Sequence, residues 1–342
     1  MKLLVFHPHL DVKGGSERLT KVFYEGVKAL GEEAVIASFR ADPEWFQDVV
    51  ELEGPEELRR LVATESPDWV FLGISETRYA GLLKGMARLA MYVHFPLEEE
   101  VDEENLADYE RRGRYLVVDP GELALVERIF VNSRRTAMAV KLVWNREAVV
   151  VHPPLERWFL DEGALVKEFP PARILCTGRF TPLKRQDFLI LSLELLRKEV
   201  PDALLTLAGF PDPRHRSYFE EVKELAERVG GVEVIDGPTD GELFELYGRA
   251  RVYAHPRIGE HFGISPCEAM ARGVPVVMRG PTGLVDVTSR FIAPSDWSFL
   301  EAVKQVLSLS EDEWFELGRD FRRKVLHLTP KNFASKILGG LQ

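Results

Sequence analysis

Two glutamates lie close together in residues 259–283, in a setting that could bind a sugar and a phosphate side by side. Glu260 is expected in a loop, and Glu268 in the first turn of the helix that follows. Ser265 is a good N-cap residue, and Pro266 suits the first helical position. Carboxylates accept hydrogen bonds from sugar hydroxyls, and the free N–H groups of a helix start bind phosphate.

The start of this predicted helix has further features of a ligand site. Gly263 lets the backbone approach a ligand closely, and the N–H groups of Ile264 and Ser265 follow it. Glu268 stands three residues after Ser265, which is the spacing of a capping box, so a purely structural role is its alternative. Glu260 has no capping role, and the alternative to a functional role is that it is an exposed loop glutamate.

Two cations upstream, Arg179 and Lys184, lie between a predicted strand and a predicted helix, in the sequence C-T-G-R-F-T-P-L-K-R-Q-D. Cations at a helix start oppose the helix dipole by about 0.3–1 kcal/mol each, so Lys184 and Arg185 indicate a bound anion. Ligands of open α/β sheets bind beyond the carboxyl ends of the strands, which is this location. The functional interpretation is that Arg179 and Lys184 bind a diphosphate; the alternative is two solvated surface cations.

Residues 179–187 and 260–275 resemble the basic loop and the E-x7-E segment of retaining nucleotide-sugar glycosyltransferases of the GT4 family, which have the GT-B fold. The sequences E-H-F-G-I and C-E-A-M are closest to the mannosyltransferases that extend dolichol-linked oligosaccharides. The resemblance implies that Glu268 binds the ribose hydroxyls. It also implies that Glu260 contacts the transferred sugar or supports charge at its reacting carbon. Arg179 and Lys184 would then stabilise the leaving diphosphate in place of a metal ion.

Two motifs in the first half of the chain support this resemblance. Gly14 and Gly15 open the sequence G-G-S-E-R, similar to a loop whose backbone approaches the donor diphosphate. His94 lies in V-H-F-P, similar to an element whose histidine faces the donor sugar. Glycine pairs before helices are common, and a histidine at a strand end is usually structural. Since no cysteine or carboxylate cluster accompanies His7 and His9, we expect neither a metal site nor a cofactor.

The expected substrates follow from the same resemblance. GDP-mannose is the favoured donor, and a UDP-sugar is the alternative. A saccharide or lipid-linked saccharide is the expected acceptor, with peripheral contact at a membrane face. Residues 279–283, R-G-P-T-G, differ from the S-G-G-P expected there, although small residues and the nearby Asp286 keep them a candidate lining of the donor site. A non-catalytic nucleotide-sugar-binding subunit is the alternative of another class.

Short β-rich runs alternate with helical patterns along the chain, which predicts βαβ units and parallel sheets. The strands expected before the polar segment 152–171 are residues 3–6, 34–38, 69–72, 91–94, 116–118, 129–131 and 149–151. Those expected after it are residues 173–177, 204–208, 232–235, 252–254 and 274–278. Helices are expected at residues 17–30, 186–198 and 332–339.

The predicted fold class is α/β, with two Rossmann-like domains facing a cleft. Residues 1–165 would form the acceptor-side domain and residues 166–328 the nucleotide-sugar domain. The GT-B resemblance implies that the helix in residues 329–342 returns to the first domain. It also implies closure by hinge motion.

The composition is that of an ordinary globular protein: 45% of the 342 residues are hydrophobic and 29% are charged. A net charge of −11 argues against a nucleic-acid partner, whose phosphates would repel the protein. Cys176 and Cys267 are expected to be free thiols in a cytoplasmic protein. No apolar run approaches the ~20 residues that span a bilayer.

Overall fold

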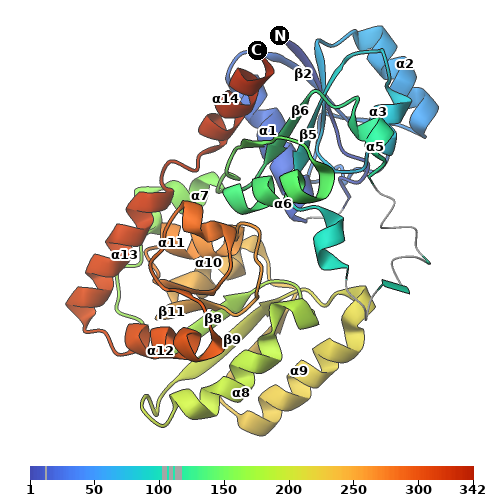
Figure 1. Ribbon diagram of the computed structural model, residues 1–342. Coiled ribbons are helices and arrows are strands. Elements are labelled where there is room, and N and C mark those ends of the chain that lie inside the picture. Colours follow the sequence, from blue (N-terminus) through green and yellow to red (C-terminus); the bar gives the residue numbers. More distant parts are fainter. Residues whose placement is uncertain (12–13, 102–105, 108–110, 112–117) are drawn as a thin grey trace. The chain divides into compact units, whose positions relative to one another are not determined.

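The computed structural model describes residues 1–11, 14–101, 106–107, 111 and 118–342 (Figure 1). The chain divides into two units: Met1–Pro154 with Leu328–Gln342, and Leu155–His327. Each contains an all-parallel sheet, so the predicted α/β class with two parallel-sheet domains is confirmed. The strand expected at 116–118 lies mostly outside the described residues.

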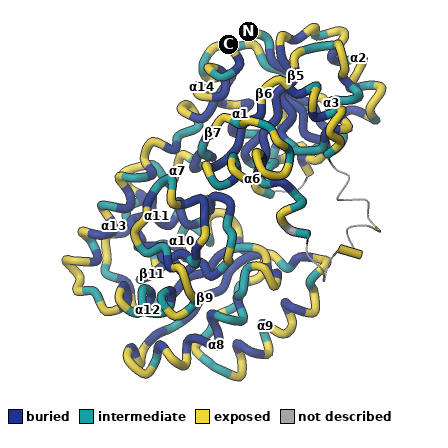
Figure 2. Tube along the Cα trace, in the orientation of Figure 1, coloured by how far each residue is buried: buried dark blue, intermediate teal, exposed yellow. Residues whose placement is uncertain are grey.

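The first unit has a sheet whose seven described strands run in the order β3-β2-β1-β4-β5-β6-β7. These strands are β1 (Lys2–Phe6), β2 (Glu33–Ser38), β3 (Val49–Glu51), β4 (Trp69–Leu72), β5 (Arg88–Val93), β6 (Arg128–Val131) and β7 (Val149–Val150). The helices are α1 (Gly15–Ala29), α2 (Pro55–Glu65), α3 (Arg78–Leu82), α5 (Pro120–Leu123), α6 (Arg134–Trp144) and α14 (Pro330–Leu341). Strands β1 and β4 are almost wholly buried, as expected of a parallel sheet covered on both faces. Strands β5 and β6 are also mostly buried (Figure 2).

The C-terminal helix α14 packs against α1 and so belongs to the first unit. Thr329 caps the helix start by accepting a hydrogen bond from Asn332 N at 3.1 Å, and Pro330 follows at the first helical position. The contact with α1 requires a glycine, because a Cβ at Gly26 would lie 2.8 Å from the Cβ of Ala334. Small residues on both helices therefore permit their close approach.

The second unit has a sheet whose six described strands run in the order β10-β9-β8-β11-β12-β13. These strands are β8 (Arg173–Thr177), β9 (Leu204–Gly209), β10 (Val232–Asp236), β11 (Val252–His255), β12 (Val276–Arg279) and β13 (Ile292–Ala293). The helices are α7 (Arg157–Leu160), α8 (Gln186–Leu196), α9 (Arg216–Val229), α10 (Asp240–Gly248), α11 (Ile264–Ala271), α12 (Asp296–Leu307) and α13 (Glu311–Val325). The described 3-10 helices of this unit are η3 (Glu162–Ala164), η4 (Pro182–Lys184), η5 (Pro213–His215) and η6 (Gly283–Asp286), and η1 (Leu97–Glu100) belongs to the first unit.

The strand order brings two distant loops together in the second unit. From β8 the chain builds outward through β9 and β10, and then returns to the other side of β8 as β11. Ligands of such sheets bind at this reversal, beyond the carboxyl ends of the two strands. The loop after β8 carries Arg179 and Lys184, and the loop after β11 carries Glu260. In the first unit β1 and β4 form the corresponding reversal, and Gly14 lies in the loop after β1.

The division between the units lies after Pro154, earlier than the predicted boundary at 165/166. Residues of α7 and the segment after it pack within the second unit. The buried guanidinium of Arg322, on α13, donates hydrogen bonds to the carbonyl oxygens of Phe159, Leu160 and Asp161 at 3.2, 3.0 and 2.7 Å. A buried charge with several carbonyl acceptors fixes this segment to the second unit.

Candidate functional site

Lys184 and Glu260 form an ion pair at the carboxyl ends of β8 and β11. Lys184 Nζ donates to Glu260 Oε2 at 2.8 Å, and the side chains are 19% and 13% exposed. Gly178, directly after β8, has φ 144° and lies against Gly209, where a Cβ would lie 1.9 Å from the Gly178 carbonyl oxygen. Glycine at both positions therefore lets the loops after β8 and β9 pack backbone to backbone and sets the path toward Lys184.

The backbone of Glu260 is held as firmly as its side chain. Gly259 N donates to Pro281 O at 3.0 Å, and Gly283 N donates to Glu260 O at 2.8 Å. Glu260 and Thr282 thus form an isolated parallel bridge beyond the main sheet. The alternative of an exposed loop glutamate is therefore wrong, because the residue is paired through both its backbone and its carboxylate.

Three positively charged or hydrogen-bonding side chains face the carboxylate of Glu260. Besides Lys184, His255 Nε2 lies 3.0 Å and Arg257 Nε 3.8 Å from Glu260 Oε2. Burial alone would raise the pKa of Glu260, but Lys184, His255 and Arg257 together lower it well below its usual range. Burial and the Lys184 charge lower the pKa of His255 to about 4. At neutral pH the cluster is a carboxylate between a cation and a neutral imidazole.

The cations at the start of α8 have protein carboxylates as partners. Lys184 pairs with Glu260, and Arg185 makes two hydrogen bonds to Asp296, at 2.9 and 2.6 Å. Arg279 Nε donates to the same Asp296 carboxylate at 2.8 Å. The Arg185 guanidinium, with Arg279, lowers the pKa of Asp296 to about 2. The inference that Lys184 and Arg185 need a bound anion is therefore wrong, because Glu260 and Asp296 supply the negative charge.

Arg179 lies in the same loop but is far more open to solvent, with 66% of its side chain exposed. Its guanidinium is 3.3 Å from Asp212, a buried carboxylate that Arg214 also binds at 2.7 Å. Gln186 Nε2 donates to the carbonyl oxygen of Arg179 at 2.9 Å and so anchors its backbone. Arg179 is thus tethered by Asp212 and is far more exposed than Lys184 in the same loop.

The helix after Glu260 begins earlier than the sequence predicts. Gly263 is the N-cap of α11, with φ 98° and ψ 77°, and no side chain caps the helix start. The predictions of Ser265 as the N-cap and Pro266 as the first helical residue are therefore wrong. A positive φ costs glycine little, so the chain turns into the helix from Gly263, and Pro266 is tolerated because first-turn N–H groups have no helical partner. Ile264 and Ser265 instead form the first helical residues.

Glu268 lies in the second turn of α11 and accepts a hydrogen bond from the hydroxyl of Tyr247 at 2.8 Å. The capping-box alternative with Ser265 is wrong, because Ser265 lies inside the helix and caps nothing. Tyr247 is fully buried, and burial raises the pKa of its hydroxyl well above its usual value. The tyrosine therefore stays protonated and donates to the half-buried carboxylate.

Two candidate residues of the first unit, Gly14 and Gly15, lie at the start of α1. Gly14 is the N-cap residue of α1 with an ordinary φ of −85°, and Gly15 begins the helix. A Cβ at Gly14 would lie 2.5 Å from Glu17 Oε2, which also accepts from Ser16 Oγ at 2.8 Å. The Glu17 side chain is flexible and could move aside, so neither its carboxylate nor the backbone conformation makes glycine necessary at position 14. Nothing lies within 4 Å of a Cβ at Gly15.

His94 directly follows β5, and its carbonyl oxygen accepts a hydrogen bond from Asn132 Nδ2 at 2.7 Å. Its Nε2 atom is buried and has no hydrogen-bond partner among the described residues, and the same holds for Nε2 of His7. Burial lowers the pKa of His94 to about 4. Both imidazoles are therefore neutral at pH 7.

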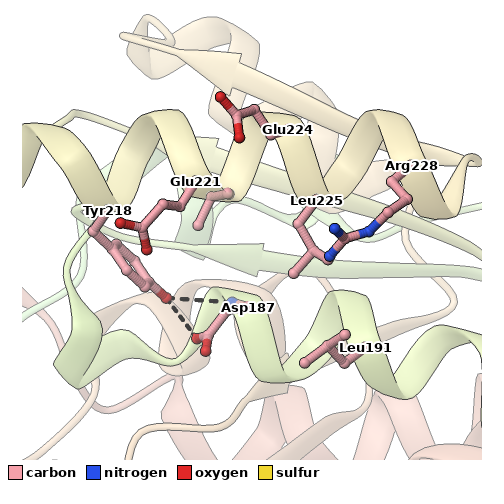
Figure 3. A pocket seen from close by; sticks show the side chains of 8 residues that line it. Asp187, Leu191, Tyr218, Glu221, Glu224, Leu225 and Arg228 are labelled. Carbon is pink, nitrogen blue, oxygen red and sulfur yellow. Dashed lines mark hydrogen bonds between the residues drawn. The ribbon is translucent and has the colours of Figure 1, made fainter.

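A pocket of about 330 Å³ lies elsewhere in the second unit, between α8 and α9 (Figure 3). Tyr218 OH donates to Asp187 Oδ1 at 2.7 Å and accepts from Asp187 N at 3.2 Å. The other residues that line the pocket are Leu191, Glu221, Val222, Glu224, Leu225 and Arg228. None of the predicted site residues lines this pocket, so it is not the candidate site.

Sequence reasoning missed the buried side chains that support the two glutamates. His255 and Tyr253 alternate along β11, so they face the same side of the sheet. Tyr247 comes from α10, and Thr177 from the end of β8. The only local signal was that Tyr253 and His255 carry polar groups at alternate positions of V-Y-A-H. A buried strand of a parallel sheet is normally a continuous apolar run, so these polar groups are not needed for its core.

We expect the free energy of unfolding to fall as the pH drops below about 6.5. Burial lowers the pKa of His7 to about 3 and that of His255 to about 4. Both histidines are neutral in the folded protein but take up a proton in the unfolded chain below its pKa. Their contribution to the free energy of unfolding is therefore fully present above the pKa of the unfolded chain, and it is lost as the pH falls toward the pKa of the folded protein. Each contributes about 1.4 kcal/mol per pH unit within that window. Melting temperatures measured between about pH 7.5 and 5 test this; a flat curve would contradict it.

Three further observations concern the cysteines, metal-binding groups and long apolar helices of the described residues. Cys176 and Cys267 are free, as predicted, and both are buried. Among these residues, no group of three or more His, Cys, Asp or Glu side chains is placed to hold a metal ion. In the same part of the chain, no helix is long and apolar enough to cross a membrane.

Residues 163–323 match the protein family described as Glycosyl transferases group 1. The matched range lies within the second unit and includes the ion pair of Lys184 and Glu260. The site described above from its geometry therefore lies in the part of the chain that the family model matches.

Named relatives are similar to the chain at low identity. The chain is 24% identical over 237 residues to the human GDP-Man:Man(3)GlcNAc(2)-PP-Dol alpha-1,2-mannosyltransferase, covering 63% of this chain and 48% of that protein. It is 25% identical over 364 residues to the alpha-1,3/1,6-mannosyltransferase alg2 of Schizosaccharomyces pombe, covering 86% and 71%. The chain thus spans about half the length of the human relative.

Among solved structures, the sucrose-phosphate synthase of Thermosynechococcus elongatus is similar over 99% of this chain and 97% of that one. The TM-score is 0.79 and the sequence identity 17%. At that identity the likeness establishes the fold alone, which is the GT-B architecture of two parallel-sheet α/β domains.

Proposed function

We propose, from the premise that residues 163–323 form a group 1 glycosyl transferase domain, that the chain transfers a hexose from a nucleotide-sugar to a saccharide acceptor. The observation that carries the proposal is the buried pair of Lys184 and Glu260 where the order of the strands reverses. Such a pair places a cation for a leaving phosphate beside a carboxylate for a sugar, and ligands bind at this point of an open sheet.

In the proposed reaction the bond between the anomeric carbon and the diphosphate breaks while the acceptor hydroxyl forms a new bond to that carbon. The acceptor attacks from the face that the diphosphate leaves, so the configuration is retained. The hydroxyl proton passes to an oxygen of the leaving phosphate. Lys184 and Arg179 stabilise the charge that develops on that phosphate, so we propose that transfer needs no metal ion and persists in EDTA.

The carboxylates have separate roles in this proposal. Glu260, held ionised by its neighbours, accepts hydrogen bonds from hydroxyls of the transferred sugar or supports charge at the reacting carbon. Glu268 binds the ribose hydroxyls with its carboxylate, one oxygen of which also accepts from Tyr247. His94 contributes to positioning the sugar. Gly14 and Gly15, with the N–H groups after Gly263, let the backbone approach the diphosphate.

We favour GDP-mannose as the donor. The sequences E-H-F-G-I and V-H-F-P support this choice, and so do the names of the human and fission-yeast relatives, both mannosyltransferases. The acceptor in the human relative's name is a dolichol-linked saccharide, and we propose a saccharide or lipid-linked saccharide here, with peripheral contact at a membrane face. The free thiols support a cytoplasmic location.

The first experiment measures the shift in melting temperature with GDP and with UDP at matched concentrations. A nucleotide present at ~100 times its dissociation constant stabilises the protein by about 2.7 kcal/mol. We expect GDP to stabilise and UDP not to, and GDP-mannose to be turned over with release of GDP. Stabilisation by UDP alone would replace the donor with a UDP-sugar. Binding without turnover for any nucleotide-sugar and acceptor would favour a non-catalytic binding subunit.

A further inference from the structure

A chain of hydrogen bonds begins at Glu268 and runs into the interior of the second unit. Tyr247 OH donates to Glu268 Oε2 at 2.8 Å. The Thr177 hydroxyl lies between two tyrosines, 3.2 Å from Tyr247 OH and 3.1 Å from Tyr253 OH. These residues come from α11, α10, β8 and β11, so the chain crosses the unit from one element to the next.

The same chain continues from Tyr253 to the ion pair. Tyr253 OH is 3.5 Å from His255 Nδ1 and 3.3 Å from the Thr177 carbonyl oxygen. His255 Nε2 is 3.0 Å from Glu260 Oε2, the atom that Lys184 also contacts. The rings of Tyr253 and His255 lie nearly parallel, at 13°. Glu260 and Glu268 are therefore joined by buried side chains, although no direct contact between them is required.

Burial and protonation determine the direction of these hydrogen bonds. Tyr247 and Tyr253 are fully buried, and Thr177 and His255 are 4% and 2% exposed, so water does not compete for their polar atoms. Glu260 is ionised and can only accept, so the proton of the neutral His255 ring belongs on Nε2. His255 Nδ1 is then an acceptor, with Tyr253 OH as its neighbour. Every hydroxyl in the chain has an acceptor in reach.

We propose that His255 is a positioning residue that holds the Glu260 carboxylate in place and ionised, and that Tyr253 and Thr177 fix its orientation. This inference rests on the proposed function of Glu260 and adds residues that act through it. Glu260 needs a second hydrogen-bond donor besides Lys184 for a physical reason. When Lys184 turns toward a diphosphate, the Oε2 atom of Glu260 keeps the hydrogen bond from His255, and a largely buried oxygen that loses its donor is costly.

The charged and titratable groups facing this pair come from several elements. Lys184 from η4 and Arg257 from the loop after β11 face Glu260, and the backbone N–H of His261 donates to its Oε1 atom at 3.2 Å. Tyr253 faces His255 from the same strand. Of the three side chains that face Glu260, His255 is the one that donates without a positive charge, so its effect on Glu260 is separable from that of the two cations.

The test compares His255→Leu with His255→Gln. Leucine fills the buried space without a donor, whereas the glutamine amide can donate to Glu260 from a position near that of the imidazole Nε2. We expect His255→Leu to lower kcat by about 10- to 100-fold, the range for losing a hydrogen bond to a charged group. We also expect the acid limb of its pH–rate profile to move to higher pH, with little change in KM for the donor. His255→Gln should recover most of both effects.

A second measurement follows the Glu260 carboxyl itself by ¹³C NMR in the nucleotide-free protein, assigned by its loss in Glu260→Gln. Glu260 should titrate at higher pH in His255→Leu than in the wild type, and return toward wild type in His255→Gln. Tyr253→Phe, which removes only a hydroxyl, should move it in the same direction by less. If His255→Leu does not fold, Tyr253→Phe is the variant that tests the proposal.

Equal pH profiles and equal Glu260 titrations in the leucine and glutamine variants would overturn the proposal. The titration needs no donor and no acceptor. A protein without transferase activity would refute the proposed function but could still show the predicted shift. An active transferase with an unchanged Glu260 titration would refute only the role of His255.

Discussion

Replacing Lys184 with alanine is expected to lower kcat by about 100- to 1,000-fold, the loss seen when one preorganised charge-stabilising group is removed. The ammonium group lies at the carboxyl end of β8, 2.8 Å from Glu260, and is only 19% exposed. A leaving diphosphate would therefore lose its nearest buried cation. His255 and Arg257 still face Glu260, so the second unit should remain folded.

The measurement is steady-state turnover with GDP-mannose, together with circular dichroism and melting temperature. Lys198→Ala is a matched control, because this lysine is exposed and lies just beyond α8 in the same unit. We expect the control to keep wild-type turnover. Near-normal turnover in Lys184→Ala, with the control also active, would remove Lys184 from the mechanism.

Replacing Glu260 with glutamine is expected to lower kcat by a similar factor of about 100 or more. The amide keeps the volume of the side chain but removes the charge that Lys184, His255 and Arg257 surround. It also leaves Lys184 without its carboxylate, so the melting temperature should fall as well. Turnover and melting temperature, measured on one preparation, separate the catalytic loss from the structural one.

The double variant Lys184→Ala with Glu260→Gln tests whether the two residues act as one unit. Groups that act together show strongly non-additive effects on rate. We expect the kcat of the double variant to be about that of the slower single variant. Its melting temperature should be higher than that of Glu260→Gln, because Lys184 is no longer present as a charge without its carboxylate. Rate losses that multiply would show that the two side chains act independently.

The buried apolar strands were predictable because their burial demands a continuous run of β-branched, aromatic and aliphatic residues. The ranges 69–72 and 173–177 agree with β4 and β8 to the residue. Helix starts were less predictable. Ser265 and Pro266 are strong local signals of a helix start, yet α11 begins at Ile264. Gly263 adopts a left-handed conformation there, which the pattern of side chains does not predict.

The sequence by itself determined the classes of element, their order, and a set of residues whose types suit a sugar and a phosphate. Only the tertiary structure decided which of them meet. Lys184 and Glu260 are 76 residues apart and form a pair because β11 returns beside β8 after β9 and β10 have been added on the other side. The partners of Arg185 and Glu268 were likewise decided by packing, since Asp296 and Tyr247 come from other helices. A local pattern reports which groups a segment offers, whereas an ion pair or a buried hydrogen bond depends on which strands become neighbours.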